Sequence, residues 1–361
     1  MNRLLELTII VCSICALASA QDSGGGLAES LVKKVDGVIR AKMERDGIPG
    51  LSAAIGRGGE LIWTRGYGFA DLENQVAATE KTVYRLASIS KPMTSVCVMQ
   101  LVEQGKIDLD AEVQELLPSF PAKRWPLTAR HLLGHLGGVR HYKNPQELAS
   151  AVHYLDLTKP LSIFKDDPLL FEPGTRYSYT TYGFNLLGSL VEAASGQNFP
   201  RYLAEHVFGP AGMKTTREDD AWAIIPHRAQ GYRKGADGEL MNSKMVDTSN
   251  KIPGGGLCGT PGDLVRFAFA VKDGTLLKPA TVRAMWTAQK TSDGKPTHYG
   301  FGWRVGAVGG RRHVGHSGAQ PRVRTQLLFF PDENIAVALM CNMEGTKLTD
   351  TAARVAAILF D

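Results

Sequence analysis

Strand-like segments lie near both ends of this chain, and a long helix-rich region separates them. Residues 47–71 contain two strand-like runs joined by a Gly-Arg-Gly-Gly turn, which is a good hairpin signal. Four more short strand-like runs lie between residues 299 and 342, and a helix is predicted at 347–360. Antiparallel strands at both ends favour one sheet assembled from the two termini, with the region between them inserted as a helical lobe.

We therefore expect an α/β plus all-α architecture with three parts. Residues 21–87 and 291–361 would form an antiparallel sheet flanked by helices, and residues 88–290 a mainly helical inserted domain. A crevice between two such lobes is a common place for a small-molecule site.

The first twenty residues have the pattern of a signal peptide. They contain Arg3, an apolar stretch over residues 7–17, and Ala18-Ser19-Ala20 before Gln21. This pattern predicts secretion with cleavage after Ala20, and the apolar stretch is too short to cross a bilayer comfortably. A retained membrane anchor is the alternative. We expect a secreted or periplasmic protein with no stable membrane insertion after the signal is removed.

The charge of the chain argues against two classes of partner, and its cysteine content argues against a disulfide scaffold. The formal net charge of +5 is spread along the chain without long basic runs, which argues against nucleic acid and against a membrane surface. Three cysteines follow the signal, at 97, 258 and 341, and an odd, sparse set predicts packed thiols rather than a disulfide scaffold. We expect no cofactor and a small-molecule or peptide substrate.

The pattern Ser-x-x-Lys can place a nucleophile and a base one helical turn apart. It begins here at Ser30, Ser88, Ser162 and Ser292. About one match is expected by chance, so the pattern alone decides nothing.

The surroundings of Ser88 set it apart from the other three. It follows an extended run and precedes a helix that is apolar nearly all round, which predicts a buried helix. Pro92 is tolerated only in a first turn, so this helix begins close to Ser88. Lys91 then lies on the same face, where burial favours its neutral form and lets it accept the hydroxyl proton. The alternative is an N-capping serine beside a lysine that reaches solvent.

Two further segments supply the partners that such a nucleophile needs. A Pro-Gly turn at 173–174 leads through Tyr179 and Thr181 into a predicted helix, and a strand ends in His316-Ser317-Gly318-Ala319. Glycine in that strand allows a close backbone approach to a ligand.

In chain order, Ser88-Ile89-Ser90-Lys91, Tyr179-Thr180-Thr181 and His316-Ser317-Gly318 resemble the three motifs of the serine β-lactamase and penicillin-binding-protein superfamily. The chain is most similar to the class C type, which also includes exported peptidases and esterases. Several segments between the motifs also resemble family segments, so the likeness covers most of the chain beyond the signal. The resemblance implies a β-lactamase/transpeptidase-like fold.

The resemblance also implies roles for individual residues. Ser88 would be the acylated nucleophile, Lys91 its partner in proton transfer, and Tyr179 the general base or acid for Ser88 and the leaving group. His316 stands where the third motif usually has lysine and would contribute a hydrogen bond and positive charge. The backbone N–H groups of Ser88 and Ala319 would form the oxyanion hole.

Substrate binding would fall to Thr181, Ser317, Gly318 and Arg322. Thr181 departs from the usual asparagine, which puts efficient β-lactam turnover in doubt more than acyl transfer. Thr-for-Asn also occurs in the mitochondrial β-lactamase-like peptidases, which "YTTYGF" resembles. Arg322 and Arg324 follow the third motif and would bind a substrate carboxylate, unless they are simply exposed strand arginines.

We thus expect an exported serine hydrolase that acts through an acyl-enzyme on a small peptide, amide or ester, as a D-aminopeptidase, DD-carboxypeptidase or esterase would. A class C-type β-lactamase is the alternative within this chemistry. A non-catalytic penicillin- or peptide-binding protein is another, because a fold does not determine a function.

A metal hydrolase is the third alternative. His131 and His135 are four residues apart on a predicted helix, with His141 nearby, and His313 and His316 also pair. The glutamate that zinc peptidases place after the first histidine is Leu132 here, so we predict no metal.

Overall fold

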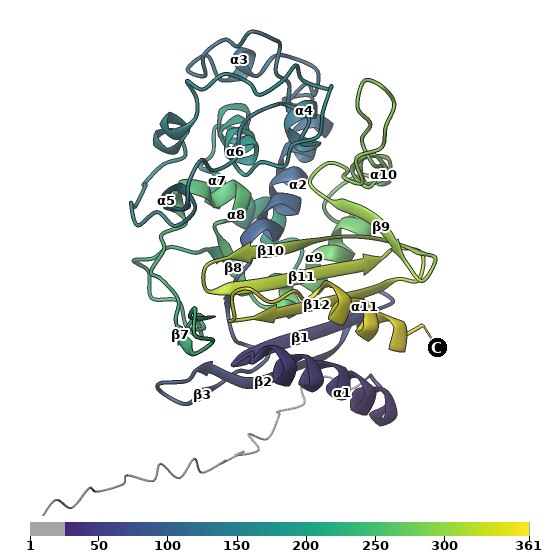
Figure 1. Cartoon of the computed structure of the whole chain (residues 1–361). Coiled ribbons are helices and arrows are strands. Elements are labelled where there is room, and N and C mark those ends of the chain that lie inside the picture. The colour runs from purple at the N-terminus through teal and green to yellow at the C-terminus, as the bar shows by residue number, and fades with distance from the viewer. Residues whose placement is uncertain (1–25, 361) are drawn as a thin grey trace, which may run out of the picture.

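The computed structural model describes residues 26–360, and within them a seven-stranded sheet dominates the lower half of the molecule in Figure 1. Its strand order is β3-β2-β1-β12-β11-β10-β9. The strands are β1 (Gly50–Arg57), β2 (Glu60–Asp71), β3 (Val76–Ala77), β9 (Arg304–Val308), β10 (Arg311–Gln320), β11 (Val323–Phe330) and β12 (Ile335–Cys341).

The two ends of the chain meet in this sheet where β1 pairs with β12. The pairing is antiparallel and runs from Leu51 opposite Cys341 to Arg57 opposite Ile335. Every residue of β12 is buried, as expected of a strand covered on both faces. The predicted antiparallel sheet formed from both termini is therefore confirmed.

Helices cover both faces of the sheet. On one face, α1 (Glu29–Asp46) and α11 (Thr349–Ile358) pack together over the strands, and both are visible in front of them in Figure 1. On the other face, α9 (Pro261–Lys272) packs against β1 and β12. A side chain at Gly56 of β1 would collide with Phe269 at 2.4 Å, so this glycine permits the close approach of the helix.

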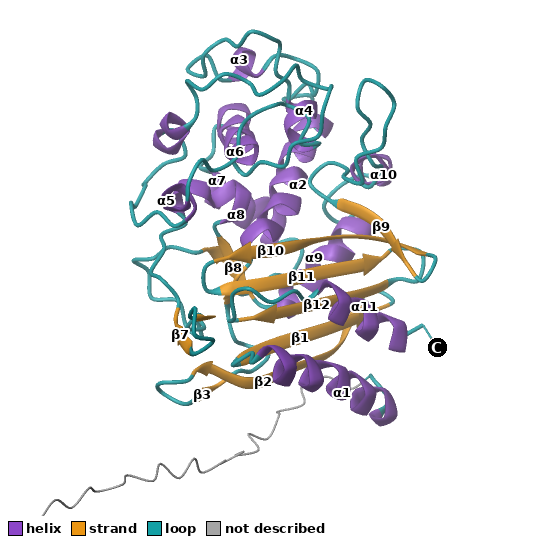
Figure 2. Ribbon diagram, viewed as in Figure 1, coloured by secondary structure: helices purple, strands orange, loops and turns teal. Residues whose placement is uncertain are grey.

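Above the sheet lies a helical region built around α2 (Ser90–Glu103) and α6 (Tyr182–Ser195), which pack against each other (Figure 2). Residues 90–99 are all buried, which confirms the helix expected from its apolar composition. The shorter helices are α3 (Val113–Leu116), α4 (Ala129–Leu133), α5 (Pro145–Leu148), η2 (Lys159–Ile163), α7 (Phe199–Leu203), η3 (Ala204–Phe208), η4 (Ser249–Lys251), α8 (Ile252–Gly255) and α10 (Pro279–Met285).

Two small sheets complete the fold. One has the order β4-β8-β5, and the other pairs β6 with β7. The strands are β4 (Tyr84–Arg85), β5 (Arg217–Glu218), β6 (Tyr232–Lys234), β7 (Leu240–Asn242) and β8 (Leu257–Gly259). β4 leads into η1 (Ala87–Ile89), the short turn that carries Ser88.

The observed elements differ from the predicted ones at a few positions. α4 ends at Leu133, so His135 lies beyond it, and β9 begins at Arg304 rather than near 299. α9 falls inside the predicted helical insert at 88–290 yet packs on the sheet, and the domain boundaries stay a prediction. The predicted signal at 1–20 lies outside the described residues. No helix within 26–360 has the length and apolar character needed to cross a membrane.

Candidate active site

Ser88 lies in the turn η1, directly before the buried helix α2. The turn is anchored by a 2.7 Å hydrogen bond from the N–H of Leu86 to the carbonyl of Leu257. Ala87 adopts a φ of +50°, which is unusual for a residue with a side chain and marks local strain. Ser88 itself is partly exposed, so a substrate can reach its hydroxyl.

Lys91 is completely buried, and its amine points at the Ser88 hydroxyl. Its Nζ lies at hydrogen-bond distance from Ser88 Oγ (3.2 Å), from Thr181 Oγ1 (3.3 Å) and from the carbonyl oxygen of Gly254 (2.6 Å). Burial lowers the pKa of Lys91 well below its usual value, and the positive charges of Arg304 and Lys251 lower it further. The amine is therefore disposed to be neutral and to accept a proton.

Tyr179 lies beside the same serine and lysine. Its phenol interacts with the Ser88 side chain, and Lys91 Nζ lies 4.9 Å from the centre of its ring. Burial raises the pKa of Tyr179 well above its usual value, against the smaller lowering effects of Ser88 and Arg304. The phenol is therefore protonated near neutral pH.

Thr181 holds the lysine from the start of α6. Its hydroxyl receives the Lys91 hydrogen bond, and its backbone N–H donates to Nδ1 of His141 at 3.2 Å. A side chain at Gly254 would lie 2.5 Å from the Thr181 methyl group, so this glycine lets the carbonyl of α8 reach Lys91. The Thr181 hydroxyl thus contacts Lys91 from the position where the family motif usually has asparagine.

His316 is buried beside this cluster on β10. Its Nδ1 donates to the carbonyl of Ser317 at 2.7 Å, and its Nε2 accepts from the phenol of Tyr299 at 2.9 Å. Burial lowers the pKa of His316 well below its usual value, and the charges of Lys91 and Arg304 add to this effect. His316 is therefore neutral near pH 7. The expectation of a positive charge at this position is wrong.

The third motif brings the edge of β10 against the nucleophile turn. A side chain at Gly318 would lie 2.0 Å from Thr325 Oγ1 and 2.4 Å from the carbonyl of Leu86. Only glycine allows this contact, which sets the exposed Ala319 beside η1. Ser317, directly before Gly318, is half-buried.

Three polar groups at the site were not identified from the sequence, and a fourth, His141, was considered there only as a metal ligand. The Tyr299 phenol forms a hydrogen bond with His316, and the Arg304 guanidinium lies 5.9 Å from the centre of the Tyr179 ring. Lys251 is buried, and burial lowers its pKa to about 7. His141 accepts from Thr181, and burial lowers its pKa to about 4. Their sequence contexts carry no motif, and only folding brings them to Lys91.

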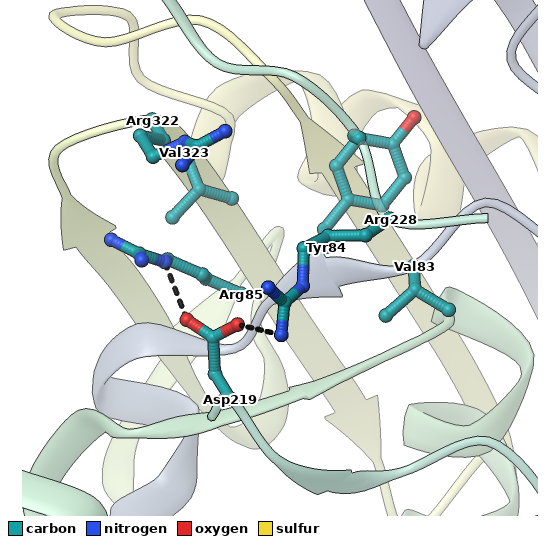
Figure 3. A pocket seen from close by; sticks show the side chains of 8 residues that line it. Val83, Tyr84, Arg85, Asp219, Arg228, Arg322 and Val323 are labelled. Atoms are coloured by element: carbon teal, nitrogen blue, oxygen red, sulfur yellow. Dashed lines mark ion pairs between the residues drawn. The ribbon is translucent and has the colours of Figure 1, made fainter. Parts of the chain in front are cut away.

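Arg322 and Arg324 have other partners. Arg322 donates to Gln230 Oε1 at 2.6 Å and lines a small cavity with Arg85 and Asp219 (Figure 3). Arg324 donates to the carbonyls of Gln320 and Val323. Both side chains are only partly exposed, and none of these partners belongs to the cluster around Ser88.

The histidines considered as metal ligands have structural partners instead. His131 shares a 3.0 Å hydrogen bond with Thr128 Oγ1, and His135 Nδ1 accepts from the N–H of Thr180. The His135 ring also packs against Tyr179, with centroids 4.3 Å apart. Residues 26–360 contain no group of three or more His, Cys, Asp or Glu side chains arranged to hold a metal ion.

Comparison with known proteins identifies the family. The family model described as Beta-lactamase matches residues 35–360. The chain belongs to the β-lactamase family. It is 29% identical to human "Serine beta-lactamase-like protein LACTB, mitochondrial" over 417 aligned positions, which cover 86% of this chain and 76% of that protein. It is also 29% identical to the D-aminopeptidase of Brucella ovis, over 82% of this chain and 57% of the relative.

Solved structures share the fold. The D-amino acid amidase from Ochrobactrum anthropi SV3 superposes with a TM-score of 0.80 at 23% identity, covering 92% of this chain and 99% of that one. A penicillin-binding protein from Bacillus halodurans gives a TM-score of 0.74 at 26% identity, over 89% and 98% of the two chains. The protein is a serine hydrolase of the β-lactamase family, and the expected fold and superfamily are confirmed.

Proposed function

We propose that this β-lactamase-family protein hydrolyses small peptides or amides through an acyl-enzyme formed on Ser88. The observation that carries the proposal is the meeting of two groups at one hydroxyl. The buried Lys91 amine hydrogen-bonds with Ser88, and the Tyr179 phenol also interacts with the Ser88 side chain. The relatives named D-aminopeptidase and D-amino acid amidase favour an amide substrate.

The shifted pKa values divide the proton transfers between the two groups. Lys91, with its lowered pKa, takes the Ser88 proton while Oγ attacks the substrate carbonyl. Tyr179, with its raised pKa, carries a proton that it gives to the departing nitrogen as the C–N bond breaks. The proton that Lys91 took from Ser88 then passes to the Tyr179 phenolate, so acylation ends with a neutral Lys91 amine and a protonated Tyr179. Water enters as the second nucleophile, gives one proton to this pair, and releases the acid as Ser88 recovers its hydrogen.

The register of β10 supports a role for Ala319 in holding the oxyanion. Gln320 and Val323 face each other across a two-residue turn, and Ala319 faces Arg324. Because hydrogen-bonded and non-bonded pairs alternate along antiparallel strands, the N–H of Ala319 then points away from β11. That N–H, with the N–H of Ser88, would bind the developing oxyanion, and one such donor is typically worth about 3–4 kcal/mol.

The remaining substrate contacts are part of the same proposal. Thr181, Ser317 and Gly318 would border the bound acyl group, since they lie beside Lys91 and on the strand against η1. His316 would position the site as a neutral hydrogen-bonding group rather than as a cation. Arg322 is not included, because its contacts lie at a different cavity.

The test compares Ser88→Ala with the wild type on D- and L-aminoacyl amides, p-nitrophenyl esters and nitrocefin. We expect amide hydrolysis to fall by at least about 10³-fold, as when other serine hydrolases lose their nucleophile. Intact-protein mass spectrometry with a fluorophosphonate should show one adduct on the wild type and none on Ser88→Ala. Ser162→Ala is the matched control, since Ser162 also begins a Ser-x-x-Lys pattern but is exposed.

Other outcomes distinguish the alternatives. Equal rates for Ser88→Ala and wild type, or loss of activity in EDTA, would refute the serine mechanism. Nitrocefin turned over faster than every amide would indicate a β-lactamase, and no adduct with any acylating probe would indicate a binding protein.

We also propose that the protein is exported, on the pattern of residues 1–20 alone. Nucleic acid and the membrane are not expected partners of the mature chain. The LACTB relatives are named mitochondrial. Recovery of the protein from an organelle such as the mitochondrion would therefore contradict export. A mature N-terminus at Gln21 on protein recovered from the medium or periplasm would support export.

A further inference from the structure

A small polar cavity lies between β4, the strand that leads to Ser88, and the turn that joins β10 to β11. Its charged lining consists of Arg85, Arg228, Arg322 and Asp219 (Figure 3). None of these four side chains takes part in the chemistry proposed at Ser88.

The charges that face this cavity do not balance. Asp219 reaches between two of the arginines, with 2.6 Å from Oδ2 to Nε of Arg85 and 3.3 Å from Oδ1 to Nη2 of Arg228 (Figure 3). Arg322 donates instead to the neutral amide of Gln230. Glu344 accepts the backbone N–H of Arg322 but does not line the cavity. Three guanidinium groups thus share one carboxylate.

Two of the arginine nitrogens also lack a partner. The Arg85 side chain is only 10% exposed, yet among the described residues its Nη1 has no hydrogen-bond acceptor. Nε of Arg228 is likewise buried and unpaired within 26–360. A buried charged donor without an acceptor is costly, and the mutual repulsion of Arg85, Arg228 and Arg322 adds to that cost. An anion in the cavity would remove both penalties.

The size of the cavity selects the anion. Its volume is about 20 Å³, and ~10–15 Å³ is enough for one water molecule. One occupant little larger than water therefore fits, whereas phosphate and sulfate, with four oxygens around a central atom, do not.

We propose that this cavity binds one chloride ion, held by the guanidinium groups of Arg85, Arg228 and Arg322. The ion links β4, which leads to the nucleophile, to the turn that follows Ala319. It stabilises the folded protein and takes no part in bond breaking, so the proposal is independent of the activity at Ser88.

A crystal soaked in sodium bromide tests occupancy directly, because bromide replaces chloride and scatters anomalously. We expect one anomalous peak among the three guanidinium groups of the full-length protein. A cavity that holds only water, without an anomalous peak, would overturn the proposal.

Thermal unfolding tests the linkage in solution. In sodium chloride the midpoint should exceed that in sodium gluconate of equal ionic strength. At a chloride concentration ten times Kd, the apparent unfolding constant should fall about 11-fold. Equal midpoints in the two salts would contradict chloride binding.

Arg322→Gln should remove the difference between chloride and gluconate while leaving both ion pairs of Asp219 in place. Its readout is this difference, which does not depend on how stable the variant is. Arg283→Gln is the control, since Arg283 is an exposed arginine of α10 away from this cavity, and it should keep the wild-type difference. Loss of the difference in the control as well would refute a specific site.

Discussion

At the scale of single residues, burial and positive charge together set the protonation of Lys91 and His316. Burial is the largest cause that lowers the pKa of Lys91 and of His316; Arg304 lowers both further, and Lys251 also acts on Lys91. No carboxylate is among the causes that shift the pKa of these two groups. Burial first, and then the charges of two residues outside the sequence motifs, favour the neutral state of Lys91.

Arg304→Gln tests this dependence through the pH profile of kcat/KM. Lys91 must be neutral to accept a proton, so activity is lost as the pH falls through the Lys91 pKa. Removal of the Arg304 charge eases protonation of Lys91 and raises its pKa, so the acidic limb should move to higher pH. Arg311→Gln, an exposed arginine paired with Glu333, should leave the limb in place. An unmoved limb in Arg304→Gln would show that Arg304 does not set this pKa.

At the scale of elements, the contact between β10 and η1 joins the sheet to the catalytic turn. The contact depends on Gly318, which faces Thr325 and the carbonyl of Leu86 with no room for a side chain. A strand and a turn that lie far apart in the sequence thereby set the distance between Ala319 and Ser88.

Gly318→Ala should therefore damage both stability and catalysis. The added methyl group must push β10 away from η1, at about 1–3 kcal/mol of stability, and a displaced oxyanion donor should lower kcat by about 10²-fold. Urea unfolding and steady-state kinetics measure the two effects.

The control makes the same substitution at Gly37, which lies exposed in α1 with no atom within 4 Å of an added Cβ. Gly37→Ala should raise stability by up to about 1 kcal/mol, because alanine favours helix, and leave kcat unchanged. Full activity in Gly318→Ala would show that the close approach is not required.

At the scale of the whole molecule, the interface between the helical region and the sheet encloses several neutral histidines. His135 and His316 are each 1% exposed, and burial lowers the pKa of both well below the usual value. His141, beside them, has its pKa lowered to about 4. Protonation of these rings therefore opposes the folded state.

Stability should fall as the pH drops through this range. Between pH 6.5 and about 4 the unfolded chain binds a proton at His141 that the folded protein does not bind, so the free energy of unfolding decreases with acidification. His141→Gln should reduce that slope by up to about 1.4 kcal/mol per pH unit. Urea unfolding at about pH 7.5 and about pH 5 measures the slope.

Exposed His227→Gln is the matched control and should keep the wild-type slope. If His141→Gln also kept it, the side chain of His141 would not be a source of the acid sensitivity.

The sequence alone determined those features that depend on local signals. Pro92 and the apolar helix behind it placed Ser88 and Lys91 one turn apart, and the structure has their side chains 3.2 Å from each other. The hairpin at one end and the strands at the other were readable because turns and alternation are local patterns. The family likeness followed from three motifs in order, and the family match confirms it.

Tertiary structure alone decided the electrostatics. Arg304 comes to the site because β9 pairs with β10, where it faces Gly315 next to His316. Arg322 goes to the cavity with Arg85 because the β10–β11 turn lies beside β4. Charge state depends on burial and on every charge within a few ångströms, and these are properties of packed segments that no single stretch of sequence contains.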